Sequence, residues 1–515
     1  MIVKIGIDRM RVTTSVLPSI RQQQSNRSTV IWFLLAYTFL FILAQLPIWL
    51  NEFLPLQDYP NHLARMYVLL NHHNDPDLQK YYQVNFMILP NLAMDIIVPF
   101  LAKFVGLDIA GRLMLVLNIF MLTSGSAFLS YALFRRINFW SLMTFMAVYN
   151  QAFIINFINF LFGTGLALWC IGIWILMREN KTWLRLVLFS CLASILFICH
   201  LYGFGIYGLV VVSYEIYSFF KQRSYFKGAI FQRLLVLFGQ FTIPAILYLS
   251  SPTSGGESIK YLTPVITKLK YVKMRMTDNY SLFLDNITII LIFFIPIAGI
   301  LLKKLRLSKY MILPLCAVTV AYFLIPAKAV TSSHADWRIL VPLFFLFLSS
   351  MEFNADKLFN RVIIGLLIVV FSVRIFVINS AWNAVQAEYK EILTAIGQIE
   401  KGSRLFSARA FNNYYATIPF IHAPTYATIE KSAFVPSFFA FGTQQPVAFQ
   451  PQYVNLAEKT MATGYEEGEG VRWKLVLDNY DYVLISNEEL MKKVPKTNLQ
   501  SVFQSPHVHL YKVKN

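Results

Sequence analysis

A short polar stretch that follows the first long apolar run carries three groups able to do chemistry. Asp58, His62 and Arg65 place a carboxylate, an imidazole and a guanidinium within eight positions of one another. A carboxylate can remove a proton from a hydroxyl group, and a guanidinium can hold a phosphate through two parallel hydrogen bonds. The alternative is that the stretch is an ordinary polar loop that caps a helix.

The local sequence predicts how these groups are held. Pro60 fixes its own φ angle and biases the residue before it toward an extended conformation. Asp58 is therefore expected on a stiff turn just outside the lipid. If a helix begins at Asn61, His62 and Arg65 fall on one face of it at positions i and i+3. The rest of the chain must then supply a membrane scaffold that positions this turn.

The composition predicts such a scaffold. Of the 515 residues, 57% are hydrophobic and only 14% are charged, with a mean hydropathy of +0.53. These values lie far from those of soluble globular proteins and indicate a polytopic membrane protein. The four cysteines all lie inside apolar runs without metal-ligand spacing, so neither a disulfide framework nor a structural zinc site is expected.

The net charge of +18 does not indicate nucleic acid as a partner, because the basic residues are not gathered in one soluble domain. They occupy every second gap between apolar runs, which the preference of lysine and arginine for the cytoplasmic side explains. Spanning helices need about 17–25 apolar residues. About eleven are expected, at 29–50, 112–134, 138–155, 158–177, 183–200, 203–220, 230–250, 286–302, 310–326, 337–351 and 361–379.

This topology divides the chain into three parts. A basic tail (1–28) is expected in the cytoplasm, and the membrane domain (29–379) includes two long outer loops, 51–111 and 251–285. Residues 380–515 contain no spanning run and are expected to form a small α/β domain outside the membrane. Within it, 404–408, 482–486 and 507–513 are predicted strands. A single histidine of this part, His422, is interpreted as structural.

Several polar groups fall on the outer face that also carries the first turn. His200 lies between two predicted spans, and His334, Asp336 and Arg338 form a cluster before another. Ionisable groups at membrane depth are costly and are usually kept for function. The alternative for His200, as for Asn156 and Asn159, is that these side chains satisfy backbone groups at helix ends.

The second outer loop is rich in lysine, which departs from the preference for positive charge inside. An anionic ligand at the outer leaflet would account for Lys268 and its neighbours, and a basic helix resting on acidic phospholipid is the alternative. These neighbours are Lys260, Lys270, Lys273 and Arg275.

The chain resembles the GT-C class of membrane glycosyltransferases in four features: an acid just after the first span, a long first outer loop, many spans and an outer C-terminal domain. Protein O-mannosyltransferases and bacterial aminoarabinose transferases belong to this class. The resemblance implies that Asp58 is the catalytic carboxylate and that the donor is a sugar on polyprenyl phosphate. The mannosyltransferases carry an acidic pair at this turn, whereas Tyr59 follows Asp58 here.

The hypothesis is an integral glycosyltransferase of the inner (plasma) membrane that moves a sugar from a polyprenyl-phosphate carrier to a cell-envelope acceptor on the outer face. Arg338 is the candidate for the phosphate, and the substrate-binding candidates around it are His62, Arg65, His200, His334, Asp336 and Lys268. No cofactor is certain. A divalent metal ion could assist Asp58 and Asp336, but no ligand spacing demands one. The alternatives are a transporter or flippase of lipid-linked sugars and a non-catalytic scaffold for envelope assembly.

Overall fold

A computed structural model describes residues 27–514 apart from 222–226, 256–262, 330–331, 355–356, 409–418, 465–470, 487–490 and 496. The predicted cytoplasmic tail therefore lies almost entirely outside the described residues. Within the described ranges, eight helices are long and apolar enough to cross a membrane. They are Arg27–Leu50 (α1), Leu107–Phe134 (α5), Ile158–Leu176 (α7), Thr182–Cys199 (α8), Leu201–Lys221 (α9), Ile230–Ser250 (α10 and α11), Leu282–Leu301 (α14, η3 and α15) and Leu358–Gly397 (α19 and α20).

The predicted count of about eleven spans is not confirmed, because three of the expected runs form shorter helices. The first is a 3-10 helix, η1 (Phe139–Ala147), followed by α6 (Gln151–Ile155). Asn150 separates them: its backbone is extended, and its side chain accepts a hydrogen bond from the Phe153 N–H. The other two runs form α16 (Ile312–Leu324) and the pair α17 (Ala335–Arg338) and α18 (Leu340–Ser349).

The run that contains η1 and α6 is apolar because it is buried in protein. Nearly all of its residues are buried. Apolar stretches of 10–14 residues are more often core helices than membrane spans, and hydropathy alone does not separate the two.

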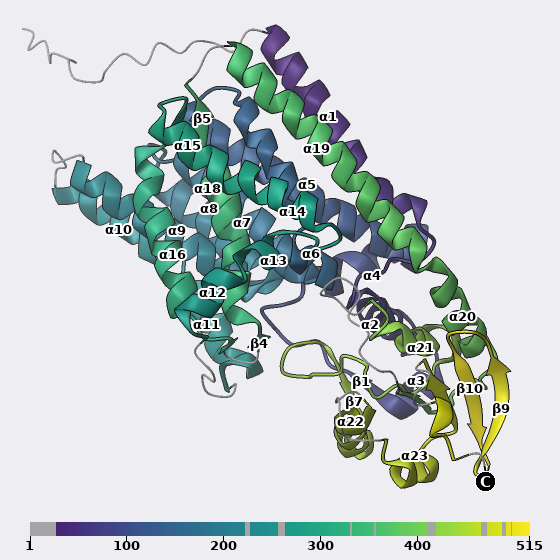
Figure 1. Cartoon of the computed structure of the whole chain (residues 1–515). Coiled ribbons are helices and arrows are strands. Elements are labelled where there is room, and N and C mark those ends of the chain that lie inside the picture. The colour runs from purple at the N-terminus through teal and green to yellow at the C-terminus, as the bar shows by residue number, and fades with distance from the viewer. Residues whose placement is uncertain are drawn as a thin grey trace, which may run out of the picture.

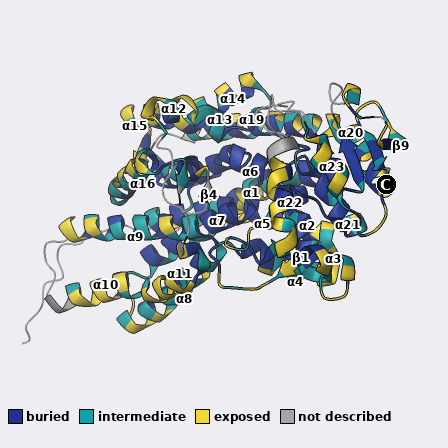
Figure 2. Cartoon of the chain, turned by 90° about the horizontal axis from the view of Figure 1, so that it is seen from below, coloured by how far each residue is buried: buried dark blue, intermediate teal, exposed yellow. Residues whose placement is uncertain are grey.

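Helix α7 occupies the centre of the bundle (Figures 1 and 2), and 83% of its most apolar window is buried. Small residues allow its neighbours to approach closely. A Cβ atom on Gly125 of α5 would lie 2.9 Å from the Gly165 carbonyl oxygen, and one on Gly203 of α9 would lie 2.6 Å from the Gly163 carbonyl oxygen. The turns at the ends of α7 are thereby held in fixed positions relative to α5 and α9.

The C-terminal segment, which the sequence analysis expected outside the membrane, lies at one end of the bundle (Figure 1). Its four-stranded sheet has the order β6-β8-β10-β9, with β6 and β8 parallel and the other pairs antiparallel. The three strands expected from the sequence are present. The strands are β6 (Leu405–Ala408), β8 (Tyr482–Ile485), β9 (Leu499–Gln504) and β10 (His509–Val513).

The first outer loop and the C-terminal segment pack together. Strand β1 of the loop pairs antiparallel with β7 of the C-terminal segment, with Tyr82 opposite Phe449. Buried side chains from both segments, among them Val68 and Phe434, form one apolar cluster. The elements concerned are α2 (Tyr59–Asn71), α3 (Pro76–Tyr81), β1 (Tyr82–Val84), α4 (Ala93–Val105), η5 (Ala423–Thr425), α21 (Tyr426–Lys431), β7 (Val447–Phe449), α22 (Pro451–Gly464) and α23 (Trp473–Asn479).

Short elements complete the fold between the longer helices. Strand β2 (Leu305–Leu307) pairs with β5 (Met351–Phe353), and β3 (Lys328–Ala329) pairs with β4 (Ser332–Ser333). The second outer loop forms η2 (Pro252–Gly255), α12 (Val265–Lys270) and α13 (Val272–Met276), and η4 (Lys309–Met311) precedes α16.

Candidate active site

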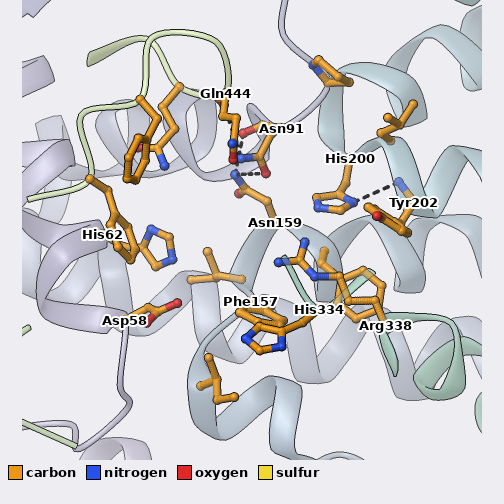
Figure 3. Close-up of a pocket in the computed structure, with 18 of the residues that line it drawn as sticks. Asp58, His62, Asn91, Phe157, Asn159, His200, Tyr202, His334, Arg338 and Gln444 are labelled. Atoms are coloured by element: carbon orange, nitrogen blue, oxygen red, sulfur yellow. Dashed lines mark hydrogen bonds between the residues drawn. The ribbon is translucent and has the colours of Figure 1, made fainter. Parts of the chain in front are cut away.

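A cavity of about 570 Å³ lies where the outer ends of the membrane helices meet the outer part of the chain. Segments that are far apart in the sequence line it: the start of α2, the segment before α4, the turn before α7, the turn between α8 and α9, η2, the region of β3 and α17, and the C-terminal segment. Figure 3 shows Asp58 and His62 on one side and Arg338, His200 and Tyr202 on the other. The cavity therefore brings together residues that the sequence analysis selected separately.

The turn that carries Asp58 is fixed to the buried run before α7. The backbone N–H groups of Gln57 and Asp58 donate to the carbonyl oxygens of Ile154 and Ile155, at 3.1 and 3.0 Å. Helix α2 begins at Tyr59, two residues earlier than expected, and Asp58 is its N-cap residue with a helical φ of −92°. The extended conformation expected for Tyr59 was wrong: Tyr59 is the first residue of the helix, and proline is well tolerated in the first turn of a helix.

Asp58 is buried, with 8% of the residue exposed. Burial disfavours its charged form and raises the pKa of Asp58 to about 7, against the opposing effects of the Gln57 amide and the Arg338 guanidinium. The His422 Nε2 atom lies 3.6 Å from the Asp58 Oδ1 atom. A carboxylate that titrates near neutral pH inside a cavity is suited to act as a general base.

His62 faces the same cavity from the first turn of α2. Its Nε2 atom lies 3.2 Å from the Asn156 carbonyl oxygen, and because a carbonyl only accepts, this nitrogen carries the proton. Burial, followed by the charge of Arg65, holds the pKa of His62 well below its usual value. The ring is therefore neutral, and its Nδ1 atom has no hydrogen-bond partner.

Arg338 is held by aromatic rings. Its guanidinium carbon lies 4.1 Å from the centre of the Phe157 ring, 5.7 Å from that of Tyr202 and 5.9 Å from that of Phe160. Its Nε atom is buried without a hydrogen-bond partner, and no carboxylate of the described chain lies within ion-pair distance of it. A desolvated cation supported in this way is available to an anion that enters the cavity.

His200 and His334 also line the cavity. The His200 Nδ1 atom accepts a hydrogen bond from the Tyr202 N–H at 3.1 Å, which leaves the proton on Nε2. His334 has a φ of 59°, and its ring lies against Phe157. Burial lowers the pKa of His334 to about 4, so this ring is neutral at pH 7.

Three other candidates lie outside the lining. Arg65 is completely buried, forms an ion pair with Asp95 at 2.8 Å and donates to the Gln445 side chain. Asp336 accepts hydrogen bonds from the Thr263 hydroxyl and the Trp337 N–H.

Lys268 is the third, and its ammonium group donates to the carbonyl oxygens of Tyr322, Phe323 and Ile325 at the C-terminal end of α16. A lysine at a helix C-terminus satisfies carbonyl groups that have no partner inside the helix. The ammonium group of Lys268 therefore stabilises the end of α16. Lys260 lies outside the described residues.

The sequence analysis missed His422, which it interpreted as structural. The C-terminal segment carries this side chain into the cavity next to Asp58, and no pattern around residue 422 indicates this. Phe439, Phe441, Gln444 and Gln445 come with it and form one wall. Asn159 lines the cavity while it also serves the backbone, as the cap interpretation expected: it accepts from the Met94 N–H and donates to the Asn91 carbonyl oxygen.

The donor set of the cavity does not fit a divalent cation. Asp58 is the one carboxylate among the described lining residues, and no group of three or more His, Cys, Asp or Glu side chains in the described chain is placed to hold a metal ion. Magnesium and calcium need several oxygen ligands. Positive charge in the described lining comes from Arg338 and Lys328.

An apolar groove of about 490 Å³ lies beside the cavity, between α8, α9 and α11. Leu201 lines both spaces, so the groove continues from the polar cavity. Gly205 contributes to its floor, and a Cβ atom built there would have no neighbour within 4 Å. The other described lining residues are Phe197, Phe204, Gly208, Phe241, Pro244, Ala245 and Tyr248.

Comparison with solved structures was decisive for the fold. The crystal structure of ArnT from Cupriavidus metallidurans in the apo state matches 94% of this chain and 98% of its own, with a TM-score of 0.51 and 9% sequence identity. The two proteins share a fold. The resemblance to GT-C transferases expected from the sequence is thereby confirmed at the level of the fold.

Two further structures show weaker similarity. They are the same ArnT bound to undecaprenyl phosphate (TM-score 0.49, 9% identity, 94% of this chain and 98% of that one) and the arabinofuranosyltransferase AftD from Mycobacteria (TM-score 0.46, 12% identity, 94% of this chain and 40% of that one). No family model and no curated protein matches the sequence.

Proposed function

We propose that this protein is an integral membrane glycosyltransferase that moves a sugar from a polyprenyl-phosphate carrier to a cell-envelope acceptor at the outer face of the inner membrane. The observation that carries the proposal is the cavity in which a buried carboxylate, Asp58, faces an arginine without an acidic partner, Arg338. The ArnT fold supports the same reading.

Asp58 serves as the general base. The acceptor hydroxyl oxygen attacks the anomeric carbon of the donor, its proton passes to the Asp58 carboxylate, and the bond between that carbon and the phosphate oxygen breaks. A carboxylate with a pKa near 7 is ionised often enough to take the proton and basic enough to hold it. A positioned base of this kind contributes about 10²–10⁴-fold to the rate.

Arg338 stabilises the leaving group. The polyprenyl phosphate departs with the bonding electron pair, and its growing negative charge needs a donor that does not have to be released from another partner first. The Nε2–H group of His200 is placed on the same side of the cavity and can add a hydrogen bond to the phosphate. Water is limited because aromatic side chains surround the guanidinium.

The apolar groove accommodates the first isoprene units of the carrier. A lipid phosphate bound at Arg338 places its tail next to the mouth of the cavity, and Leu201 connects the cavity to the groove. The empty volume above Gly205 gives the tail room against α9. In this arrangement the N-terminus faces the cytoplasm and the cavity faces outward.

The test is transfer in membranes that contain the wild-type chain or Asp58→Asn at equal protein levels. The donors are undecaprenyl phosphates carrying radiolabelled glucose, mannose, galactose, arabinose or aminoarabinose, and the product is label in the envelope fraction. We expect transfer from one donor and a loss of at least about 100-fold in the variant. Full transfer by Asp58→Asn would remove Asp58 from the role of base. No transfer from any donor, combined with movement of the lipid across the bilayer, would favour the transporter instead.

A further inference from the structure

His422 reaches Asp58 from a segment more than 350 positions away in the chain. Its Nε2 atom lies 3.6 Å from the Asp58 Oδ1 atom, just beyond hydrogen-bond length. The His422 side chain is 9% exposed and the Asp58 side chain 11% exposed. Hydrogen bonds of catalytic groups are often long before substrate binds and shorten in the complex. The position of the imidazole proton decides whether this contact attracts or repels the carboxylate.

Asn61 determines where that proton lies. The Asn61 Oδ1 atom accepts from the Phe439 N–H at 2.7 Å, and its Nδ2 atom donates to the Ser437 carbonyl oxygen at 2.6 Å. A backbone N–H only donates and a carbonyl only accepts, so the orientation of the amide is fixed. Its second amide hydrogen points to the His422 Nδ1 atom, 3.0 Å away.

The His422 Nδ1 atom must therefore accept, and the proton of the neutral ring lies on Nε2, which faces Asp58. Burial lowers the pKa of His422 to about 3, so the ring stays neutral at pH 7. Phe439 packs against the ring, with its centroid 4.7 Å away, and limits rotation. An N–H group in a fixed direction is thus presented to one carboxylate oxygen.

The two oxygens of Asp58 have different surroundings. Gln57 Nε2 and His422 Nε2 both approach Oδ1, at 3.5 and 3.6 Å. In the described chain, Oδ2 has no hydrogen-bond or ion-pair partner. Oδ2 is therefore the oxygen available to take a proton, while Oδ1 is the one held in place.

We propose that His422 is a positioning residue for Asp58, with Asn61 fixing its Nε2–H tautomer so that Oδ1 is held and Oδ2 faces the acceptor hydroxyl. The role as base rests on the proposed function, but the tautomer and its effect on Asp58 do not. The C-terminal segment thereby completes the site, since without it the carboxylate loses a hydrogen-bond donor.

Other charged or titratable groups face Asp58 and must be separated from His422 in any test. They are the other cavity-lining groups: His62 of α2, His200 before α9, Lys328 of β3, His334 before α17 and Arg338 of α17. His62 donates its Nε2–H to the backbone at Asn156 and not to the carboxylate. Arg338 lowers the pKa of Asp58 through its charge, and that effect is the same with and without His422.

Two spectroscopic measurements on the full-length chain in nanodiscs test the proposal without any substrate. In ¹⁵N-histidine-labelled protein at pH 7, the His422 signal, assigned by its loss in His422→Gln, should show a protonated Nε2 and an unprotonated Nδ1. In Asn61→Asp the new carboxylate accepts from Nδ1, so Nδ1 should become protonated. A wild-type ring with the proton on Nδ1 would overturn the proposal.

The second measurement is the pKa of Asp58, followed by the infrared carbonyl band that Asp58→Asn abolishes. In His422→Phe the pKa should rise, because an N–H group that faces the charged form is lost. His422→Gln, whose amide can place an N–H near the same point, should return it toward the wild-type value. A matched thermal unfolding curve shows that both variants fold, and an unchanged Asp58 pKa in His422→Phe contradicts the proposal. If the Asp58 pKa shifts in His422→Phe as expected but the wild-type protein transfers no sugar, the proposed function is rejected and the positioning role of His422 is not.

Discussion

Two arginines of this protein, a buried one on α19 and a partly exposed one at the cavity, have opposite surroundings. Arg374 of α19 is 2% exposed, pairs with Asp278 at 2.6 Å and donates to the Thr288 hydroxyl and to the backbone at Met146 and Tyr149. Each of its nitrogen atoms has a partner. It joins α19 to η1 and to the segment before α14, and it leaves no donor for a ligand.

Arg338 has aromatic rings where Arg374 has oxygen atoms. Its charge is supported by Phe157, Tyr202 and Phe160, and its Nε atom has no hydrogen-bond partner. A buried charge with incomplete pairing costs free energy, and proteins keep such groups where an incoming ligand completes them. The comparison indicates that Arg374 holds the fold, whereas Arg338, which lines the cavity, is available to a ligand.

The largest expected effect is on transfer activity, and it distinguishes the role of Arg338 in the site from that of Arg374 in the fold. In Arg338→Gln, transfer should fall by about 10²–10³-fold, the range seen when one donor to a developing charge is removed, and the melting temperature should stay within a few degrees of wild type. Arg374→Gln leaves Asp278 buried without its partner, which costs about 3–5 kcal/mol. Its main loss should be in the yield of folded protein. Equal losses of folded protein in both variants would remove the distinction.

The next prediction concerns the pH dependence of transfer. Asp58 has a pKa of about 7 and acts as a base only when ionised. The value of kcat/KM should therefore fall about tenfold for each pH unit below 7 and level off above it. His334 and His422, with pKa values lowered to about 4 and 3, do not titrate in this range. A profile that is flat from pH 5 to 8 would contradict the assignment of Asp58.

A smaller effect is expected in the apolar groove. Gly205→Leu fills empty space without a clash, and Gly365→Leu on α19, where a Cβ atom also meets nothing within 4 Å, is the matched control. Burial of each methylene contributes about 0.8 kcal/mol, so loss of part of the tail contact should raise the KM for an undecaprenyl donor about tenfold or more. A donor with a two-isoprene tail should be affected much less. An equal rise for both donors would place the tail elsewhere.

The smallest effect is expected from a chelator. Asp58 is the one carboxylate in the described lining, and Arg338 and Lys328 bring positive charge to it, so EDTA should change the transfer rate by less than about twofold. Restoration of lost activity by magnesium or manganese would show that residues outside the described ranges supply further ligands.

The sequence predicted the parts of this site that depend on local signals. Asp58, His200 and Arg338 were found because ionisable groups next to apolar runs are unusual. His422 was missed because its role depends on how the C-terminal segment packs on α2, and nothing near residue 422 reports that contact. Lys268 looked like a ligand for anions because its partners, three carbonyl groups of α16, lie more than 50 residues away.

The predicted count of about eleven spans is not confirmed for a related reason. The run 138–155 is as apolar as a membrane helix, yet it is broken at Asn150 and enclosed by other helices. Hydropathy reports that a segment avoids water, and it does not report whether lipid or protein takes the place of water.

The most direct test of the central claim is a structure of the wild-type chain in nanodiscs with undecaprenyl phosphate, the carrier without a sugar. The account predicts phosphate density within hydrogen-bond distance of the Arg338 guanidinium and tail density that passes Leu201 into the groove at Gly205. Phosphate density against another cation, or an empty cavity at a concentration that saturates binding, would contradict it.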